Sequence, residues 1–445
     1  MKTITKALVA FVKRYLPNPY SLAIVLTIII FVCGLAMTSH GITDMVRFFG
    51  DGLYSNLAFI MQMIMILFAG YALAISPVVI KILKAMASIP KTRYGALAFT
   101  FTLSMICGYI NWGFGLVAAA LIAKEVTAKN RGKKIDFAIM VAAAYAATQV
   151  TALSSAVPLL SSTPGHFLEG TIGIIPLGET LFAPFNIIIT LVIWLSVVIL
   201  LKFINPSENE AIELDYSIVT AEEELAANFN KENENKKMTP AEKLDSFSLL
   251  SFFIVALIFI YVVMYFMNNG FMNLSTNIVI TIFLGFGMLA HKKPIAYVYA
   301  VNEGIKTCGG IALLFPIYFG LMGMMRFSGL ATSMSEWFVT FSTARTLPLF
   351  TFWSASLVNL FIPSGGGQWA VQGPVMTQAA VTLGASVPKT AMAVAWGDLC
   401  TNLIQPFWTI PVLAIAKKDV KDIMGYCFVM FIVEFIVISA GFILL

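Results

Sequence analysis

Long stretches without a charged side chain restrict how this chain can fold more than any other feature of its sequence. Residues 346–388 contain no acidic or basic residue, and the middle of this stretch reads IPSGGGQWAVQGP. Three glycines after Pro363 disfavour a continuous helix, because Gly costs roughly 1 kcal/mol relative to Ala and Pro lacks a backbone donor. In hydrocarbon, a broken backbone persists only where protein or a water-filled cavity covers its amide groups. We therefore expect a covered helix break at this point.

Composition indicates that hydrocarbon is the relevant solvent. Hydrophobic residues make up 59% of the chain and charged residues only 11%, and many apolar runs are long enough to cross a bilayer. The first of them, residues 21–37, follows a basic start but is too long for a cleaved signal peptide and lacks its small-residue ending. We expect an all-α polytopic membrane protein.

One segment has the opposite character. Residues 204–247 hold almost half of the 23 acidic residues, together with four lysines. Such a segment cannot bury a core, so it predicts a solvated linker between membrane helices.

The distribution of Lys and Arg predicts the orientation of the spans, because these residues prefer cytoplasmic loops. When the amino terminus is placed in the cytoplasm, the basic clusters fall inside as well, at residues 81–93, 124–134, 292–306 and 417–421. Outside the linker, the basic residues left on the other side are Arg47, Arg326, Arg345 and Lys389. We therefore expect a multi-pass protein with a cytoplasmic N-terminus and a cytoplasmic linker.

The uncharged segment between Arg93 and Lys124 is too short for two crossings. Both residues lie inside in this orientation, whereas two full spans need about 20 apolar residues each. The segment must therefore enter the membrane and return to the same side, turning at the glycine-containing stretch GYINWGFG. We expect a re-entrant helical hairpin at about residues 94–123. The stretch at about residues 346–388 is analogous and is expected to return to the outside.

An internal repeat supports this analogy. The sequence GDGLYSNLAFIMQMIMILFAGYALA, from Gly50, aligns with NEGIKTCGGIALLFPIYFGLMGMM, from Asn302, and the same spacing brings the two hairpins into register. An odd number of crossings between the copies, including an extra span near residues 249–266, makes the second copy inverted. Inverted repeats with discontinuous helices are typical of secondary transporters, whose binding sites lie at the repeat interface near the membrane midplane.

These patterns predict about nine full spans plus two hairpins, with a discontinuous span in each repeat. Each repeat contains one of the hairpins described above. The expected segments are a first inverted repeat at residues 1–203, the acidic cytoplasmic linker at 204–247, a connecting span at 248–268 and a second inverted repeat at 269–445.

The hairpin tips are the expected substrate site. Glycine lets a backbone approach a ligand closely, and the amino termini of half-helices attract anions without a full positive charge. Neither hairpin contains a Lys or Arg that could do this instead. Polar residues and glycines also serve as contacts between membrane helices, so packing is the alternative role. The candidate substrate-binding residues are Asn111, Gly113, Gly115, Ser364, Gly365, Gly366, Gly367 and Gln368.

Two carboxyl groups lie within apolar runs, where charges are rare and often functional. Asp398 stands near hydroxyl and amide side chains that suit a hard cation, and a carboxylate buried among apolar residues also suits proton uptake. Capping of a broken helix is the alternative role for Asp398. Glu434 lies in the final span, where a subunit contact or a structural hydrogen bond would explain it equally well. The candidate ion-coupling residues, for a proton or a sodium ion, are Asp398, Thr401, Asn402, Thr151 and Ser154.

Other classes of function lack support in the sequence. No His, Cys or carboxylate cluster has metal-ligand spacing and no Ser/His pair is evident, so neither an enzyme nor a metal or other cofactor is expected. No P-loop or dinucleotide fingerprint occurs, which argues against an ATP-driven pump and against nucleic-acid partners. A channel or facilitator for small organic anions is the main alternative to a carrier, because re-entrant hairpins also build pores.

Five segments resemble the short-chain fatty acid uptake family of the AtoE type, within the ion-transporter superfamily: GDGLYSNLAFIMQM, INWGFGLV, IPSGGGQWAVQGP, QPFWTIPVLAIA and KDIMGYC. The resemblance covers nearly the whole chain apart from the acidic linker. It implies proton- or sodium-driven uptake of small monocarboxylates, such as butyrate or acetoacetate, across the bacterial cytoplasmic (inner) membrane. By looser analogy, it implies a transport domain that moves against a scaffold. Relatives can carry His after the glycine triplet, where this chain has Gln368, which cannot titrate.

The expected partners are therefore a small carboxylate substrate and the lipid bilayer. Substrate chain length, coupling stoichiometry and assembly into homo-oligomers are left open by the sequence.

Overall fold

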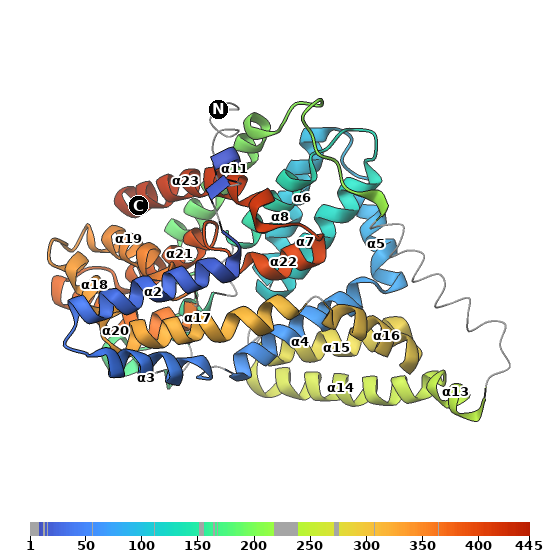
Figure 1. Ribbon diagram of the computed structural model, residues 1–445, viewed down its shortest axis with the longest axis horizontal. Coiled ribbons are helices and arrows are strands. Elements are labelled where there is room, and N and C mark those ends of the chain that lie inside the picture. The colour runs from blue at the N-terminus through green and yellow to red at the C-terminus, as the bar shows by residue number, and fades with distance from the viewer. Residues whose placement is uncertain are drawn as a thin grey trace.

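The structure is a computed structural model that describes residues 9–11, 14–15, 17–55, 57–110, 112–150, 155–162, 165–166, 168–217, 239–270, 276–306, 308–363 and 365–445. Within these ranges the chain forms helices joined by turns and loops, and no strand occurs in them (Figure 1). The expected all-α class is therefore confirmed.

Before the acidic linker, the helices are α2 (Pro19–Met37), α3 (Ile42–Leu53), α4 (Leu57–Ala74), α5 (Pro77–Ala87), α6 (Arg93–Ile110), α7 (Trp112–Lys129), α8 (Phe137–Thr148), α9 (Ala156–Ser161), α10 (Glu169–Ile172) and α11 (Pro184–Ile204). The later helices are α13 (Pro240–Asp245), α14 (Ser248–Asn269), α15 (Thr276–His291), α16 (Pro294–Ile305), α17 (Gly309–Phe327), α18 (Leu330–Val339), α19 (Leu347–Asn359), α20 (Gly365–Leu383), α21 (Val387–Thr401), α22 (Thr409–Ala416) and α23 (Val420–Leu444).

Five helical segments among the described residues are long and apolar enough to cross a membrane: α2, α11, the α13–α14 segment, α17 and α23. α4 and α5 qualify together but are bent by 75° at the break between them, so they add a sixth only if the bent pair is one span. α8 and α15 are apolar but shorter. These helices support a multi-pass membrane protein, while the number of about nine full spans stays a prediction.

Helix boundaries repeat along the chain at a nearly constant spacing. α16, α17 and α18 begin and end 252 or 253 residues after α3, α4 and α5. The packing contacts repeat as well. α2 and α3 pack on α17, whereas α15 and α16 pack on α4. Figure 1 shows these two groups of helices side by side. The arrangement agrees with the expected internal repeat, whereas the inverted orientation of the second copy stays a prediction.

Glycine lets α3 approach α17 closely. A Cβ atom on Gly52 would collide with the carbonyl oxygen of Phe319 and would lie 2.9 Å from the Cα atom of Gly320. The counterpart of Gly52 in the second copy is Gly304, where a Cβ atom would lie 2.9 Å from the Cα atom of Phe68. Small residues at such crossings let membrane helices associate through backbone contact, since lipid provides no hydrophobic driving force between helices.

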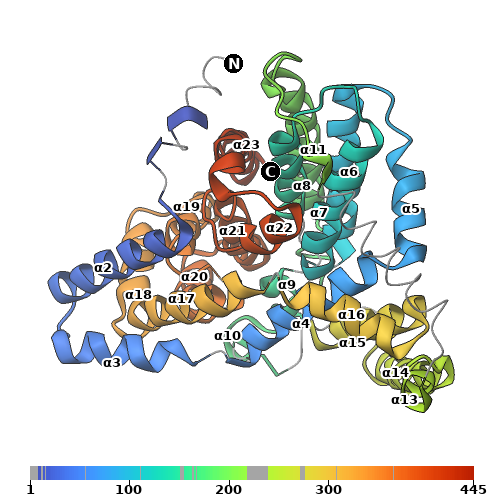
Figure 2. The same cartoon turned by 45° about the vertical axis from the view of Figure 1, so that its right-hand side comes forward.

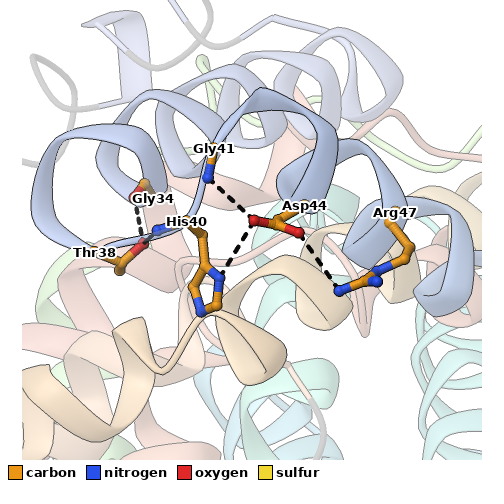
Figure 3. Close-up of polar contacts among 6 residues, drawn as sticks. All are labelled: Gly34, Thr38, His40, Gly41, Asp44 and Arg47. Carbon is orange, nitrogen blue, oxygen red and sulfur yellow. Dashed lines mark hydrogen bonds and ion pairs between the residues drawn. The ribbon is translucent and has the colours of Figure 1, made fainter.

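One carboxylate organises the turn that leads into α3 (Figure 3). Asp44 accepts a hydrogen bond from the backbone N–H of Gly41 at 3.2 Å. Its oxygens also lie 3.6 Å from His40 Nδ1 and 3.5 Å from the guanidinium of Arg47. Exposed ion pairs contribute little to stability, so the main effect of Asp44 is to cap α3 and to set the direction in which it leaves α2.

The centre of the remaining helices is formed by α8 and α21 (Figure 2). Every residue of α8 is buried, as is every residue of α21 from Thr390 onward. α6 and α7 pack against each other and against α8, whereas α19 and α20 pack against each other and against α21. The first pair turns between Ile110 and Trp112, and the second between Asn359 and Gly365. Both turns fall within the expected hairpins, while their re-entrant course in a membrane stays a prediction.

The beginning of the acidic linker is anchored to α8. Asp136 caps this helix by accepting a hydrogen bond from the N–H of Ile139 at 3.0 Å, and its other oxygen accepts one from the N–H of Ile212 at 2.9 Å. In return, the N–H of Phe137 donates to the carbonyl oxygen of Ile212 at 2.9 Å. The segment expected to be a solvated linker thus starts with a part that is fixed to one of the central helices.

We expect Gly52→Ala to lower the free energy of unfolding by about 1–3 kcal/mol, because the added methyl group must push α3 away from α17. Gly50→Ala is the matched control in the same helix, since nothing lies within 4 Å of a Cβ atom at that position and alanine is the better helix former. Thermal unfolding of the purified protein in detergent measures both variants. Equal unfolding temperatures would contradict a close crossing at Gly52.

Candidate functional site

Two helix breaks lie at the centre of the molecule. α8 ends at Thr148 and α9 begins at Ala156, while α21 ends at Thr401 and α22 begins at Thr409. Both breaks fall in polar stretches of the sequence, TQVTALSS and TNLIQ, and they agree with the expectation of one discontinuous span in each repeat. The ends of broken helices expose backbone groups that need partners, and in a membrane protein these partners must come from the protein or from enclosed water.

Side chains at the two breaks hydrogen-bond to one another. The hydroxyl group of Tyr145 donates to the carbonyl oxygen of Asn402 at 2.7 Å. Asn402 Nδ2 donates to Gln149 Oε1 at 3.1 Å, and Gln149 Nε2 donates to Thr148 Oγ1 at 2.9 Å. All four residues are buried, so these bonds satisfy groups that would be costly to leave without partners. The network ties the end of α8 to the end of α21.

A third helix joins this network through Asn359, the last residue of α19. Its Nδ2 atom, which has two hydrogens to donate, lies within hydrogen-bond distance of three acceptors: the carbonyl oxygen of Asp398 at 2.8 Å, Thr401 Oγ1 at 3.0 Å and Asn402 Oδ1 at 2.8 Å. The Oδ1 atom of Asn359 is buried and has no hydrogen-bond partner among the described residues. The sequence marks Asn359 as one of the polar residues around the second hairpin tip, but it did not assign Asn359 to the substrate site or to the ion site.

The carboxyl group of Asp398 faces the tip of the second helix pair. Asp398 is only 6% exposed, and a Cβ atom on Gly365 would lie 3.0 Å from its Oδ2 atom. Cβ atoms on Gly365 and Gly366 would lie 3.6 and 3.7 Å from the Cβ atom of Ala156, at the start of α9. Asp398 Oδ1 and Ser155 Oγ are buried without a hydrogen-bond partner in the described part of the chain. The amino termini of α9 and α20 therefore converge near Asp398.

This arrangement joins residues that the sequence analysis divided between a substrate site and an ion site. Gly365 lies beside Asp398 and Gly366 beside Ala156, as just described. Thr401 and Asn402 lie one helical turn further along the chain from Asp398, but their side chains bond to Asn359 and to the end of α8 instead of to the Asp398 carboxyl group. They hold the break together in this conformation.

Gln368 has a different environment from the one expected for a residue that binds substrate. Its Nε2 atom donates to the carbonyl oxygen of Ala355 at 2.8 Å and to Gln372 Oε1 at 2.7 Å. Gln372 in turn donates to Ser335 and Ser354 at 2.9 and 3.0 Å. These bonds connect α20 to α19 and α18, so Gln368 holds the arms of the helix pair together in this structure.

Gly115 likewise serves close packing, at the first helix pair. A Cβ atom on Gly115 would collide with the Cα atom of Gly108 and would lie 2.9 Å from its nitrogen atom, so α6 and α7 meet backbone to backbone. The ring of Trp112, at the start of α7, stacks edge-to-face on Trp408 with 5.3 Å between ring centroids. The first tip thus packs near the start of α22, as the second tip packs near the start of α9.

The binding and coupling roles of all the expected site residues stay predictions. Gly113 and Gly367 lie in the first turns of α7 and α20, and their binding roles stay predictions. Four others lie outside the described residues: Asn111, Ser364, Thr151 and Ser154.

The electrostatics of the second tip favour a single negative charge. The amino terminus of α20 carries a partial positive charge, and the Asp398 carboxyl group already lies beside it. A second carboxylate, from a bound ligand, would be repelled by an ionised Asp398. Binding of an organic anion at this place therefore requires a proton on Asp398 or a metal cation nearby, and the site can link the two binding events.

Comparison with known proteins identifies the class of molecule to which this geometry belongs. The short chain fatty acid transporter family matches residues 1–445. The chain belongs to this family. A relative from Escherichia coli strain K12 is 39% identical over 427 residues and one from Haemophilus influenzae is 40% identical over 438 residues, and both are provisionally named short-chain fatty acid transporters. Each alignment covers 95% of this chain and 95% of the relative.

Two solved membrane-transport structures are also similar in part. The Neisseria gonorrhoeae MtrF structure, from a class of antimetabolite efflux pumps, aligns at 14% identity and a TM-score of 0.37, over 98% of this chain and 95% of that chain. The Alcanivorax borkumensis YdaH transporter aligns at 15% identity and a TM-score of 0.41, over 96% and 97% of the two chains. TM-scores below 0.5 are too low to transfer topology or a site to this protein.

Membership of the short chain fatty acid transporter family confirms the resemblance seen in the sequence. It identifies a transport protein and not an enzyme, and it agrees with the apolar helices of a multi-pass membrane protein. The convergence of Asp398 with two helix amino termini is therefore a candidate transport site.

We expect Gly365→Ala to reduce the uptake rate of a radiolabelled short-chain fatty acid by roughly tenfold, equivalent to about 1.4 kcal/mol. The new methyl group would crowd Asp398 Oδ2 at 3.0 Å, whereas at Gly366 it would meet only Ala156 at an ordinary contact distance of 3.7 Å. Gly366→Ala is thus the matched control and should transport nearly normally. Uptake into proteoliposomes with equal amounts of protein measures the difference. Equal rates for both variants would show that the space beside Asp398 is unimportant.

Proposed function

We propose that this family member is a secondary active transporter that imports short-chain fatty acids or related small monocarboxylates, such as butyrate and acetoacetate, together with a proton or a sodium ion. One observation carries the proposal: the carboxyl group of Asp398 lies at the tip of α20, beside the start of α9. A protein that brings a substrate carboxylate to its own carboxylate must bind a cation with it.

The substrate carboxylate binds at the amino terminus of α20. The first N–H groups of a helix have no partner within the helix, and at Gly365 and Gly366 no side chain covers the backbone. Ser155, whose buried hydroxyl lacks a partner among the described residues, supplies a further donor. Because these groups carry only partial charges, they hold the anion without the strong attraction of a Lys or Arg, which permits release.

A proton is one candidate for the coupling ion. Protonation of Asp398 removes the repulsion between its carboxylate and that of the substrate, so that proton and substrate bind together. Release of either one on the cytoplasmic side then favours release of the other. In this route Asp398 is the coupling group, and the bonds made by Thr401 and Asn402 hold its helix end in place.

A sodium ion is the other candidate, and the surroundings of Asn359 support it. The Asp398 carbonyl oxygen, Thr401 Oγ1 and Asn402 Oδ1 all lie 2.8–3.0 Å from Asn359 Nδ2. Rotation of the Asn359 amide would exchange this nitrogen for its Oδ1 atom, which has no partner among the described residues. An oxygen atom in that position would repel the three others unless a cation lay between them, and oxygen ligands suit a hard cation.

The transport cycle that we propose depends on the predicted topology. The two helix pairs are re-entrant hairpins of inverted repeats, the N-terminus and the acidic linker are cytoplasmic, and the membrane is the bacterial inner membrane. The hairpins and the broken helices α8 and α21 move together against a scaffold that includes α2–α4 and α14–α17. The repeated helix boundaries and the exchange of packing partners between the copies support this division.

Purified protein in liposomes should accumulate radiolabelled butyrate when a gradient of the coupling ion is imposed, and uptake should saturate. Imposing proton and sodium gradients separately identifies the ion. Asp398→Asn should lose gradient-driven accumulation but keep counterflow exchange, because the amide resembles the protonated acid and cannot release a proton. Flux that neither saturates nor shows counterflow would instead identify a channel or facilitator.

Thr401→Val distinguishes the two coupling routes with almost no change in side-chain size. In the sodium route it removes one ligand and should raise the sodium concentration needed for half-maximal uptake. In the proton route it should leave the response to a pH gradient intact. Accumulation by Asp398→Asn that equals that of the parent protein would rule out Asp398 as the coupling residue.

For the topology, single cysteines at Asn233 and at His166 should react with a membrane-impermeant maleimide from opposite sides of the membrane. We expect His166, which is only partly buried in the structure, to be labelled from outside, and Asn233 to be labelled only after permeabilisation. The five native cysteines are replaced in this background. Labelling of both positions in intact cells would exclude the cytoplasmic linker and the inverted repeat.

A further inference from the structure

Glu434, in α23, is a second buried carboxyl group near the helix breaks. No part of the residue is exposed, and both carboxyl oxygens lack a hydrogen-bond partner among the described residues. In an apolar interior, an ionised carboxylate without a partner costs far more than the neutral acid, so Glu434 holds a proton in this conformation. Polar groups buried without partners are rare, and ionisable ones inside a membrane usually mark a functional site.

The burial of Glu434 removes the two explanations that its place in the sequence allows. A subunit contact needs an accessible side chain, yet a single chain already covers Glu434 completely. A structural hydrogen bond needs a partner, and none of the residues that the structure describes provides one. α23 packs against α8, α11, α19, α21 and α22. Glu434 is thus enclosed by the helices that carry the two breaks.

Among the helices that pack against α23, α8 carries the titratable residue Tyr145 and α21 carries Lys389, Asp398 and Cys400, while α23 itself carries Lys421, Asp422, Tyr426 and Cys427. Of these, Tyr145, Cys400 and Cys427 interact electrostatically with Glu434. α19 and α22 contain no titratable residue, and the only one in α11 is Lys202, in its last turn. Tyr145 connects Glu434 to the candidate site. Its hydroxyl group is also within electrostatic reach of Asp398, and it donates the hydrogen bond to Asn402 that ties α8 to α21.

We propose that Glu434 is a proton-binding site of the transport cycle and controls the junction between α8 and α21 through Tyr145. The inference rests on the proposed function and adds a second proton-binding group to it. While Glu434 is protonated, Tyr145 donates to the Asn402 carbonyl oxygen and the two breaks stay joined. When Glu434 loses its proton, its carboxylate becomes the better acceptor for the Tyr145 hydroxyl, because a hydrogen bond to a charged group is about twice as strong as a neutral one. The Asn402 carbonyl is then released, and the ends of α8 and α21 lose one of the bonds between them.

The transport test compares the pH profile of counterflow exchange between variants of the full chain in liposomes. Glu434→Gln keeps the shape of the protonated acid but cannot release a proton, and Tyr145→Phe removes only the hydroxyl group. Glu336→Gln is the matched control, because Glu336 is an exposed carboxylate on α18. We expect the inflection of the wild-type pH profile to be lost in the first two variants and kept in the control. The double variant of Glu434 and Tyr145 should behave like either single variant.

Infrared spectroscopy of the purified protein gives a readout that does not depend on transport. With isotopically labelled glutamate, the wild type should show a protonated-carboxyl band at neutral pH that shifts with the label. The band should be absent from Glu434→Gln and present in Asp398→Asn.

A wild-type spectrum without a label-sensitive band overturns the proposal, even if Glu434→Gln does not fold. A Glu434→Gln protein that keeps the wild-type pH inflection overturns it as well. Failure of the wild type to transport any short-chain fatty acid would instead overturn the proposed function, and the infrared band would still decide whether Glu434 binds a proton.

Discussion

The structure depends on one constraint: α8 and α21 end in the interior of a membrane protein, where little water is available to hydrogen-bond the backbone groups at the helix ends. The partners come from the protein, and each break is completed by the other half of the chain. Tyr145 of α8 satisfies the carbonyl oxygen of Asn402 beyond the end of α21, and the Asn402 side chain reaches back to Gln149. Asn359, at the end of α19 in the second helix pair, donates a further hydrogen bond to the side chain of Asn402. The two halves are therefore joined at their breaks by hydrogen bonds donated from each half to the other.

Close approach of helices makes this junction geometrically possible, and it explains why glycines in this chain have different roles. A Cβ atom on Gly397 would collide with the Cβ atom of Ala355 and would lie 2.8 Å from the nitrogen of Ser356, so α21 touches the backbone of α19 just before Asp398. Gly115 does the same between α6 and α7. Gly365 instead leaves room for the Asp398 carboxyl group. A glycine in a membrane helix is thus evidence of close packing first, and its neighbours decide whether a ligand is involved.

The sequence was sufficient for the features that depend on local chemistry. The two helix pairs lie where charge spacing and helix-breaking residues predicted hairpins, and one further helix break lies in each half of the chain, as expected. It was insufficient for features that depend on distant partners. Asn359 bonds to residues 39 to 43 positions away, and Tyr145 bonds to one 257 positions away. The environment of Glu434 was likewise hidden, because α23 is apolar on all sides and its periodicity does not indicate which face is buried.

The two breaks occupy matching positions in the two halves of the chain, but the side chains at these positions differ in chemistry. Counted from the last residues of α8 and α21, Thr148 matches Thr401, and Gln149 matches Asn402, the residue that follows each helix. By the same count Tyr145 matches Asp398. The tyrosine finds an acceptor in the opposite half, whereas the Asp398 carboxyl group keeps an oxygen without a partner among the described residues. Tyr145 also lies within electrostatic reach of Asp398, so a carboxylate in its place would add a second negative charge to the same buried region. In this structure one copy therefore places a neutral donor at its break, and the other copy places a carboxyl group there.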